Sequence, residues 1–163
     1  ILGVHPLHNP AKLISVYGPL ADYLSAQLPG IQIRVEASKN YPAYDEKIEQ
    51  EKFDFILPNP YQTLNSLDNF YEVINQVGES DLFRGLILVR KDSKVKHVRD
   101  LRGKKIAYPA PTALAATMMP QLFLQNKGLD LRKTQTLYVG SQESSIMNVY
   151  LGHTSASAAW TIP

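Results

Sequence analysis

The chain has 163 residues, 44% of them hydrophobic and 20% charged, which is enough for one domain or two small lobes around a hydrophobic core. Cysteine is absent, and this excludes disulfide frameworks, thiolate metal sites and cysteine nucleophiles. The net charge of +2 is the small excess of 17 Lys and Arg over 15 Asp and Glu, without a long basic or acidic block. The sequence therefore points to neither a nucleic-acid nor a membrane-surface partner, and no apolar stretch is long enough to span a bilayer.

The first half of the chain alternates apolar strands with helices. Apolar residues recur at helical spacing from Leu13 to Leu28, while Ile31, Ile33 and Val35 alternate with polar residues as they do in a strand. In chain order the patterns predict a strand at 1–4, a helix at 11–28 with a kink or restart at Gly18–Pro19, a strand at 31–35, a helix at 42–50 capped by Asn40, a strand at 53–57, a helix at 61–67, a strand at 71–77 and a fully buried strand at 85–90.

The second half repeats this alternation. The patterns predict a helix at 98–101, a strand at 105–108, a helix at 114–127 ended by Gly128, a strand at 136–139, a helix at 143–151 ended by Gly152 and a strand at 156–160. Apolar residues of the two longer helices are expected in the core, namely Leu114, Met118, Leu122, Ile146 and Val149. Such alternation predicts an α/β fold with a mostly parallel sheet and helices on both faces.

One stretch of the second half predicts a ligand site. A basic step at 104–105 leads into the strand 105–108, and a loop with Pro109, Pro111 and Thr112 leads on to the next helix. A helix that begins beyond the carboxyl end of a parallel strand directs unpaired backbone N–H groups and the positive end of its dipole to that place. Open α/β sheets bind their ligands there.

The order of elements and several local motifs resemble the type II periplasmic solute-binding proteins, in particular the subfamily that binds phosphonate, phosphite or phosphate for ABC transporters. The matching motifs are Gly3-Val4-His5-Pro6, Tyr17-Gly18-Pro19-Leu20-Ala21-Asp22-Tyr23-Leu24, Asn40-Tyr41-Pro42-Ala43-Tyr44, Phe53-Asp54-Phe55-Ile56-Leu57-Pro58-Asn59-Pro60-Tyr61, Arg84-Gly85-Leu86-Ile87-Leu88-Val89 and the segment 100–107. No single motif is diagnostic, but the ordered set is fairly specific and covers the chain essentially end to end.

The resemblance implies two α/β lobes joined by a hinge, with lobe one at 1–84 and lobe two at 85–163, closing on a ligand between them. It also implies a periplasmic or other extracytoplasmic location, a small polar or anionic solute as ligand, an ABC permease as partner and no cofactor. Sensor kinases and related receptors use the same fold as their input domain. A ligand-sensing domain beside a sensor-kinase transmembrane region is therefore the alternative function.

The resemblance and the first residue also carry expectations about the ends of the chain. Ile1 is not an initiator Met, so we expect an upstream segment, such as a signal peptide, to have been removed. Family members return from the second lobe to the first and finish with helices on the first lobe, whereas this chain stops at 160–163. We therefore expect it to be part of a longer protein.

The chain departs from the family pattern at the binding site. Members that bind phosphonate have a Ser-Thr-Ser-Gly stretch before the second-lobe helix, where this chain has Ala113-Leu114-Ala115-Ala116. Gln142 stands in the position of a family histidine, and Ser155 falls near the position of an acidic residue. Backbone N–H groups still suit an anion, but we expect simple phosphonates to bind weakly.

Four candidate ligand residues lie in the loops of the first lobe. His5 follows the first strand and is either a site residue or a loop histidine with solvent or backbone partners. Tyr41 aligns with a tyrosine that contacts the ligand in the family, and its ring with a polar tip suits a binding wall. Asn59 and Tyr61 flank Pro60 at a strand end, where they either contact the ligand or serve as helix cap and packed ring.

The remaining candidates lie at the crossover and in the second lobe: Phe83, Arg84, Thr112, Ala113, Gln142, Ser144 and Trp160. Arg84 presents a planar guanidinium to an anionic ligand or pairs with Glu79 or Asp81. Thr112 acts as helix cap, ligand donor or both, and Gln142 and Ser144 belong to the same class at the next helix, with Ser141 as its cap. Trp160 lines the cleft or covers an edge of the lobe.

Catalytic motifs are absent from the sequence. It has no Gly-x-Ser-x-Gly elbow, Walker loop, dinucleotide glycine pattern or His-Glu-x-x-His helix. Enzymatic activity is therefore the weakest alternative, and no metal site is expected. Lys94, Lys96, Lys104 and Lys105 form no tight cluster in the sequence and are expected on a solvated face.

Overall fold

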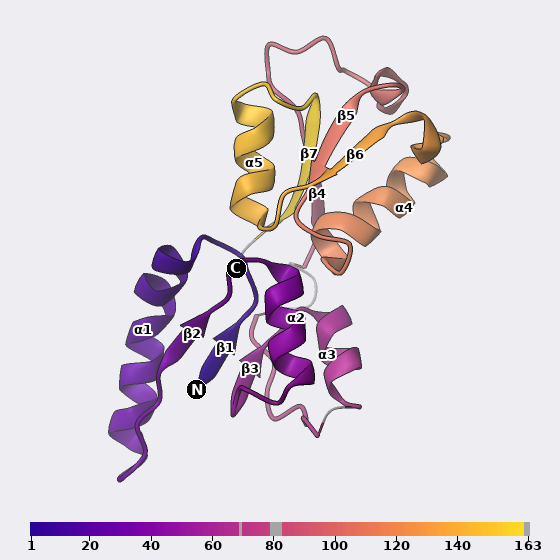
Figure 1. Ribbon diagram of the computed structural model, residues 1–163. Coiled ribbons are helices and arrows are strands. Elements are labelled where there is room, and N and C mark those ends of the chain that lie inside the picture. The colour runs from indigo at the N-terminus through magenta and orange to yellow at the C-terminus, as the bar shows by residue number, and fades with distance from the viewer. Residues whose placement is uncertain (69, 79–82, 162–163) are drawn as a thin grey trace. The chain divides into compact units, whose positions relative to one another are not determined.

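The computed structural model describes residues 1–68, 70–78 and 83–161, and it divides into two compact units (Figure 1). Unit 1 is Ile1–Ile74 and unit 2 is Asn75–Pro163. The division therefore falls earlier in the chain than the expected boundary between 84 and 85. The segment 75–84 belongs to the unit that contains all the later elements.

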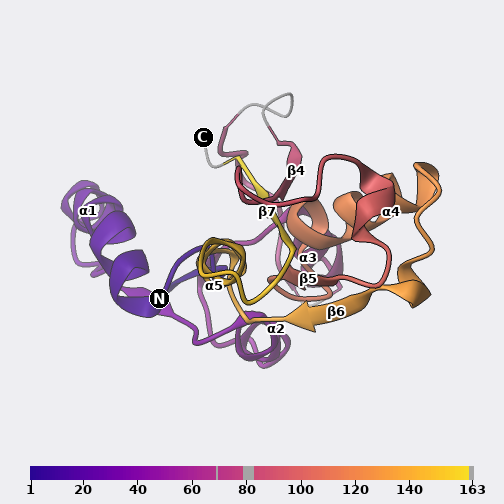
Figure 2. The same ribbon diagram turned by 90° about the horizontal axis from the view of Figure 1, so that it is seen from above.

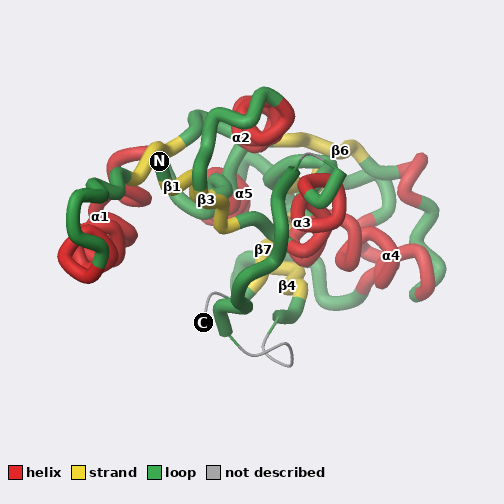
Figure 3. The backbone as a smooth tube through the Cα atoms, turned by 90° about the horizontal axis from the view of Figure 1, so that it is seen from below, coloured by secondary structure: helices red, strands yellow, loops and turns green. Residues whose placement is uncertain are grey.

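Unit 1 is a three-stranded parallel sheet with helices on both faces. Its elements are β1 (Leu2–Val4), α1 (Pro10–Gln27), β2 (Val35–Ala37), α2 (Tyr41–Glu49), β3 (Phe55–Leu57) and α3 (Pro60–Ser66). The strand order is β2-β1-β3, so the chain moves from β1 to one side and then crosses back to the other. Because such crossovers are right-handed, α1 and α2 lie on opposite faces of the sheet, as Figures 1 and 3 show.

Local signals place the three helices of unit 1. Asn9, Asn40 and Asn59 each accept a backbone N–H bond as N-caps, and a proline occupies the first turn of each helix. The expected cap at Asn40 is therefore confirmed. Helix α1 continues through Pro19 without a restart.

Two predicted strands of unit 1 differ in the structure. Strand β2 covers Val35–Ala37 rather than 31–35, because the Ile33 backbone N–H donates to the Ser25 hydroxyl (2.8 Å) and not to a strand. The segment 71–77 forms no strand. The Tyr71 hydroxyl, which donates to the Phe53 carbonyl (2.8 Å), anchors its beginning, and Ile74 is 75% exposed.

Unit 2 is a four-stranded mixed sheet in the order β4-β7-β5-β6, in which β4 is antiparallel to β7 and the other pairs are parallel. Its elements are β4 (Gly85–Leu88), the 3-10 helix η2 (Val98–Leu101), β5 (Lys105–Tyr108), the π-helix η3 (Leu114–Met118), α4 (Met119–Asn126), the 3-10 helix η4 (Leu131–Lys133), β6 (Gln135–Tyr138), α5 (Gln142–Tyr150) and β7 (Ala156–Trp160). Helices α4 and α5 flank this sheet on opposite sides (Figures 1 and 2). The predicted α/β class with mostly parallel sheets is confirmed.

The core of unit 2 differs from the prediction at one residue in each of two helices, α4 and α5. Leu124 is fully buried, whereas Leu122 is 58% exposed and Ile146 is 37% exposed, so the prediction of core positions for these last two was wrong. The reason for Leu122 is the π-helical turn, in which Met119 N–H bonds to the carbonyl of Leu114 and the extra residue rotates every later side chain. Val149 is buried as expected, and Leu114 and Met118 are half-buried.

Strand β4 was also expected to be fully buried and is not. Leu86 is 38% exposed, because β4 is the edge strand of its sheet. Its first residue, Gly85, packs so closely on the π-helical turn that an added Cβ would overlap the Ala115 carbonyl oxygen. A glycine at this point lets the strand and the turn approach.

Candidate functional site

The carboxyl ends of the parallel strands meet at one edge of each sheet, and this edge is called the carboxyl edge of its unit. In unit 1 it comprises the residues directly after β1, β2 and β3, and in unit 2 those after β5, β6 and β7. Antiparallel β4 begins at the same edge, because Gly85 pairs with Trp160. The direction in which successive strands are added to the sheet reverses at β1 in unit 1 and between β5 and β7 in unit 2. Ligands of open α/β sheets bind at such switch points.

His5 is buried at the carboxyl edge of unit 1, with 5% of its surface exposed. Its backbone N–H and its ring Nδ1 both approach the Leu57 carbonyl oxygen, at 3.2 and 2.9 Å. A carbonyl only accepts, so Nδ1 carries the proton in this contact. Burial lowers the pKa of His5 to about 4, which leaves the imidazole neutral at pH 7. The expected alternative of a backbone partner thus holds for Nδ1.

Tyr41 and Asn59 lie at the same edge. Tyr41 is 1% exposed, and its ring meets the His5 ring edge-on with the centroids 6.2 Å apart. Burial, with the nearby charge of Asp45, raises the pKa of Tyr41, so its hydroxyl is a neutral donor. The fold thus brings His5 and Tyr41 together next to the end of β3.

Asn59 caps α3 in a complete capping box. Its Oδ1 accepts the backbone N–H groups of Tyr61 (2.9 Å) and Gln62 (3.1 Å), and the Gln62 side-chain oxygen accepts the Asn59 N–H (3.1 Å). The interpretation of Asn59 as a helix cap is therefore confirmed for its Oδ1. Tyr61 is half-buried in the first turn of α3.

Sequence reasoning missed one residue of this edge. Ser38 directly follows β2 and is 2% exposed, and its hydroxyl has no hydrogen-bond partner among the described residues. The signal would have been a hydroxyl residue directly after a strand. It could not be recognised, because the predicted strand at 31–35 ends several residues before Ser38. With β2 at Val35–Ala37, Ser38 becomes the first residue of the carboxyl edge.

At the carboxyl edge of unit 2, Gln142 is joined to Trp160. The Gln142 Nε2 donates to the Trp160 carbonyl (3.2 Å), and the Trp160 N–H donates to the Gln142 Oε1 (3.1 Å). Both polar atoms of the amide therefore hold the end of β7, where the ring of Trp160 also packs on Phe83 with the centroids 5.0 Å apart. Gln142 positions Trp160 in this structure.

Arg84 lies beside this cluster. Its carbonyl oxygen accepts the Thr161 N–H (3.3 Å), and its side chain is exposed. The expected alternative, an ion pair with Glu79 or Asp81, lies outside the described residues. Arg84 is thus placed at the carboxyl edge by its backbone.

The loop after β5 contributes mostly backbone. The N-cap of the π-helix is Ala113, which makes no side-chain hydrogen bond, so the expectation that Thr112 caps this helix was wrong. Ala113 is 2% exposed and Thr112 is half-buried. Thr117, which sequence reasoning missed, is 1% exposed and places a hydroxyl without a hydrogen-bond partner among the described residues inside the same turn.

The start of α5 carries two hydroxyls. The Ser141 Oγ accepts the Ser144 N–H (3.1 Å) and lies 3.0 Å from the Ser144 Oγ, which confirms Ser141 as the cap. Ser145, one residue further, donates to the carbonyls of Ala107 and Ala158 and so ties α5 to β5 and β7. Ser144 is therefore the more accessible hydroxyl of this turn, and it is half-buried.

Neither a metal centre nor a membrane span is found in the part of the chain that the structure describes. No three His, Asp or Glu side chains in it are grouped as ligands for a metal ion. None of its helices combines the length and apolar character needed to cross a bilayer.

Comparison with known protein families gives one match. The model described as "ABC transporter, phosphonate, periplasmic substrate-binding protein" matches residues 2–161. No curated protein sequence matches this chain significantly.

Comparison with solved structures gives similar folds at low identity. A binding-protein component of an ABC phosphonate transporter from Pseudomonas aeruginosa has a TM-score of 0.86 at 17% identity, over 98% of this chain and 56% of its own. PhnD1 from Prochlorococcus marinus in complex with methylphosphonate has a TM-score of 0.83 at 19% identity, over 98% of this chain and 62% of its own. The alkanesulfonate-binding protein SsuA from Xanthomonas axonopodis pv. citri, bound to MOPS, has a TM-score of 0.62 at 20% identity, over 98% of this chain and 53% of its own. The chain thus spans less than two thirds of the length of these proteins.

Proposed function

Because this chain belongs to the family of periplasmic substrate-binding proteins of ABC phosphonate transporters, we propose that it binds a small anionic solute outside the cytoplasmic membrane and presents it to an ABC permease. The solute is bound without chemical change. The alternative, a ligand-sensing input domain, has less support, because the similar structures described above include components of transport systems.

The observation that carries this proposal is the gathering of candidate residues at the two carboxyl edges. In unit 1 the buried residues His5, Tyr41 and Ser38 lie at the ends of adjacent strands or at the start of the next helix. In unit 2 the π-helix and α5 both begin at the carboxyl edge. Backbone N–H groups at helix starts favour an anion, which supports an acidic solute.

The side chains of unit 2 support a singly charged oxyanion, such as a sulfonate or a carboxylate, in preference to a phosphonate. Alanines occupy the start of the π-helix, and the amide of Gln142 is already bonded to the backbone of Trp160. A doubly charged phosphonate needs more donors, and each hydrogen bond to a charged group contributes about 1.5–3 kcal/mol. Losing several such donors lowers phosphonate affinity by orders of magnitude.

A calorimetric titration tests both parts of the proposal. The full-length protein is titrated with methanesulfonate, MOPS, acetate and methylphosphonate at constant ionic strength. We expect saturable binding of a sulfonate or carboxylate with weaker binding of methylphosphonate, and an unchanged solute after incubation. Tighter binding of methylphosphonate would overturn the ligand class, and conversion of the solute to product would overturn the function.

Arg84 gives a mutational test of the site. An exposed guanidinium that reaches the anion contributes one charge-assisted contact, so Arg84→Ala should weaken sulfonate binding by about 1.5–3 kcal/mol. Arg84→Lys should restore part of this loss, because an ammonium cannot form the bidentate contact. Arg132→Ala, which removes a guanidinium paired with Asp130 in the same unit, is the matched control. Equal affinities in all four proteins would remove Arg84 from the site.

A further inference from the structure

Charge is divided unequally between the two units. Of the 17 Lys and Arg residues, 5 lie in unit 1 and 12 in unit 2, whereas 9 of the 15 Asp and Glu residues lie in unit 1 and 6 in unit 2. The formal net charge is therefore −4 for unit 1 and +6 for unit 2. The small overall charge of +2 conceals a basic unit, and charge asymmetry of this kind indicates a surface with an anionic partner.

The fold gathers several of these basic residues, among them Lys104 and Lys133, at the end of unit 2 where its parallel strands begin, opposite the carboxyl edge. Helix η2 leads into β5, and η4 leads into β6. Backbone hydrogen bonds from Gly103 N–H to Lys133 O (2.7 Å) and from Gln135 N–H to Lys104 O (2.9 Å) join the two approaches. Gly103, Lys104 and Lys133 are all exposed.

A groove of about 520 Å³ lies at this end, lined by Lys96, His97, Val98, Arg99 and Lys127, and we call it the basic groove. Among the described residues, no carboxylate forms an ion pair with Lys96, Arg99 or Lys127. The neighbouring Asp100 carboxylate accepts the backbone N–H groups of Lys96 (3.0 Å) and His97 (2.8 Å), so it acts as a cap for η2.

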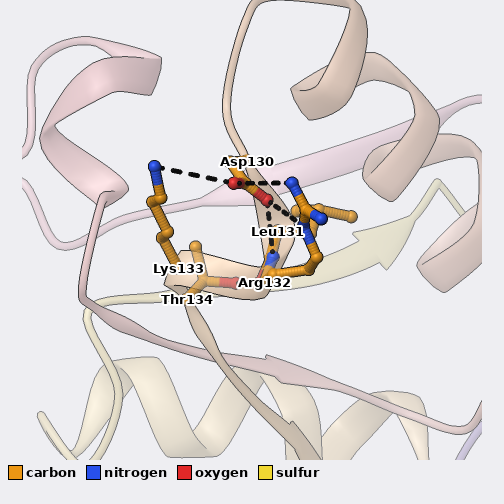
Figure 4. Close-up of polar contacts among 5 residues, drawn as sticks. All are labelled: Asp130, Leu131, Arg132, Lys133 and Thr134. Carbon is orange, nitrogen blue, oxygen red and sulfur yellow. Dashed lines mark hydrogen bonds and ion pairs between the residues drawn. The ribbon is translucent and has the colours of Figure 1, made fainter.

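One acidic side chain elsewhere at this end is neutralised locally. Asp130 pairs with Arg132 (3.0 Å) and Lys133 (3.7 Å), as Figure 4 shows. The Arg132 guanidinium lowers the pKa of Asp130, which therefore stays ionised and uses its charge within this pair. The Asp100 carboxylate interacts with Arg99 and offsets part of the positive charge of the basic groove, which keeps a net positive charge from Lys96, Arg99 and Lys127.

An apolar surface adjoins the basic groove. Met119, Leu122 and Phe123 of α4 recur at positions i, i+3 and i+4 and are 42%, 58% and 47% exposed, and we call them the apolar stripe. The Lys127 Nζ lies 5.8 Å from the centroid of the Phe123 ring, so the stripe continues into the groove. The same displacement by the π-helical turn that removes Leu122 from the core presents it at this surface.

We propose that the basic groove and the apolar stripe dock unit 2 on the headgroup region of an anionic phospholipid bilayer. Lys96, Arg99 and Lys127 attract the phosphate groups, and the apolar side chains enter the boundary between headgroups and acyl chains. A soluble polyanion uses the basic groups alone, whereas a bilayer uses both surfaces, and this favours the bilayer. The basic groove lies at the other end of the strands from the carboxyl edge of unit 2, so the phosphate groups of the bilayer and a solute use different ends of this unit.

This inference departs from an expectation made from the sequence. Because Lys96 and Arg99 are far from Lys127 along the chain, the sequence shows no basic block and indicated no membrane-surface partner. The groove exists only after α4 and η2 have been brought together by the fold.

Flotation of the full-length protein with vesicles tests the proposal. Vesicles of phosphatidylcholine alone are compared with vesicles of phosphatidylcholine and phosphatidylglycerol in equal amounts. We expect binding to the anionic vesicles that is at least about tenfold stronger, and that falls steeply as sodium chloride rises. Equal binding to both vesicles would overturn the proposal, and so would displacement by inorganic phosphate at matched ionic strength, which would indicate a small-anion site.

Two variants locate the surface. The triple variant Lys96→Glu, Arg99→Glu, Lys127→Glu should lose binding by about tenfold or more. Its matched control, Lys12→Glu, Arg34→Glu, Lys52→Glu, changes the charge by the same amount at exposed positions of unit 1 and should retain binding. Similar losses in both would mean that net charge alone governs attachment, and retained binding in the first would remove the groove.

The apolar stripe and the independence from the proposed function are tested in the same assay. Leu122→Gln with Phe123→Gln should reduce vesicle binding by about threefold, and Leu64→Gln, at an exposed position of α3, should not. An unchanged affinity of the double variant for anionic vesicles would favour an acidic protein or another polyanion as partner. Sulfonate titration should be unchanged in every variant, so failure of docking and failure of solute binding are distinguishable.

Discussion

The two units place candidate residues at the same topological position but build this position from different chemistry. In unit 1 the carboxyl edge consists of buried side chains, such as His5, Tyr41 and Asn59, and the His5 Nδ1 and the Asn59 Oδ1 are bonded to backbone. In unit 2 the edge consists of helix starts among alanines, with Gln142 bonded to the backbone of Trp160. Under the proposed function, the shared strand-end geometry sets where a ligand binds, and the local side chains decide which ligand it is.

The two units also differ in how tightly glycines are packed, and this gives the largest expected effect. An added Cβ at Gly85 of unit 2 would overlap the backbone oxygen of Ala115, whereas at Gly3 of unit 1 it would lie 2.6 Å from the Phe53 ring. The Ala115 oxygen cannot move without the π-helical turn to which it belongs, but a ring can rotate or shift. Gly85→Ala should therefore destabilise the protein by roughly 3 kcal/mol or more and Gly3→Ala by roughly 1–2.

Urea unfolding of both glycine variants measures this difference. Gly18→Ala serves as control, because Gly18 has open space around it and lies inside α1. Alanine favours a helix interior over glycine, so this control should be neutral or slightly stabilising. A Gly3 variant less stable than the Gly85 variant would contradict the packing of β4 on the π-helical turn.

The buried His5 of unit 1 predicts a pH dependence. Its pKa is about 4 in the folded protein and about 6.5 when unfolded, so both states are neutral above pH 6.5. As the pH falls from 6.5 to 4, the unfolded state takes up a proton that the folded state does not, and the free energy of unfolding falls by about 3 kcal/mol in total. Below pH 4 the loss is complete.

Comparison with His5→Gln isolates this effect, because the carboxylates of the protein titrate in both proteins. The free energies of unfolding of the two proteins, measured between pH 4 and pH 7, should converge as the pH falls, with the wild type losing more. Parallel curves would mean that His5 is accessible to a proton in the folded state.

The sequence predicted the features that depend on neighbouring residues. The caps Asn40 and Ser141 and the strand Ala156–Trp160 lie where they were expected, because a cap or a short apolar strand is specified within a few residues. It failed where a distant group decides the outcome. The Ser25 hydroxyl accepts the backbone N–H of Ile33, and β2 begins only at Val35. The sequence therefore did not predict that Ser38 lies at the carboxyl edge.

The same distinction explains the errors in unit 2. The π-helical turn changes which side chains of α4 face the core, and no residue pattern in 114–127 predicts the extra residue of that turn. The role of Gln142 depends on Trp160, which lies on another element, so a ligand role and a positioning role are indistinguishable in the sequence. Local physics is readable from the sequence, whereas pairing across elements needs the fold.

Gln142 sharpens the comparison at the carboxyl edge of unit 2. In Gln142→Glu the side chain cannot donate to the Trp160 carbonyl, and a buried negative charge is placed beside that oxygen. We expect a loss of about 2 kcal/mol in the free energy of unfolding at pH 7, with part of it recovered at a pH where the new carboxyl is protonated. Met147→Glu, at an exposed position of the same helix, should change stability by less than about 0.5 kcal/mol. If Gln142→Glu is as stable as wild type, the amide is free to serve a ligand instead.

The helix caps provide the smallest effect and compare the two units at equal chemistry. Asn40 caps α2 of unit 1 through Ala43 N–H (3.0 Å), and Ser141 caps α5 of unit 2 through Ser144 N–H (3.1 Å). Replacing either with alanine leaves a backbone donor without its partner and should cost about 1 kcal/mol. Asn40→Gly and Ser141→Gly should cost only a few tenths of a kcal/mol, since glycine is accepted at this position.

Amide exchange measured helix by helix checks the location of the loss: Asn40→Ala should speed exchange in α2 and Ser141→Ala in α5. Because Ser141 also fixes the hydroxyl of Ser144, at 3.0 Å, only the Ser141 variants should in addition alter solute affinity through that side chain. A change in affinity with Asn40→Ala as large as that with Ser141→Ala would mean that the start of α2, where Tyr41 lies, governs the ligand as strongly as unit 2 does.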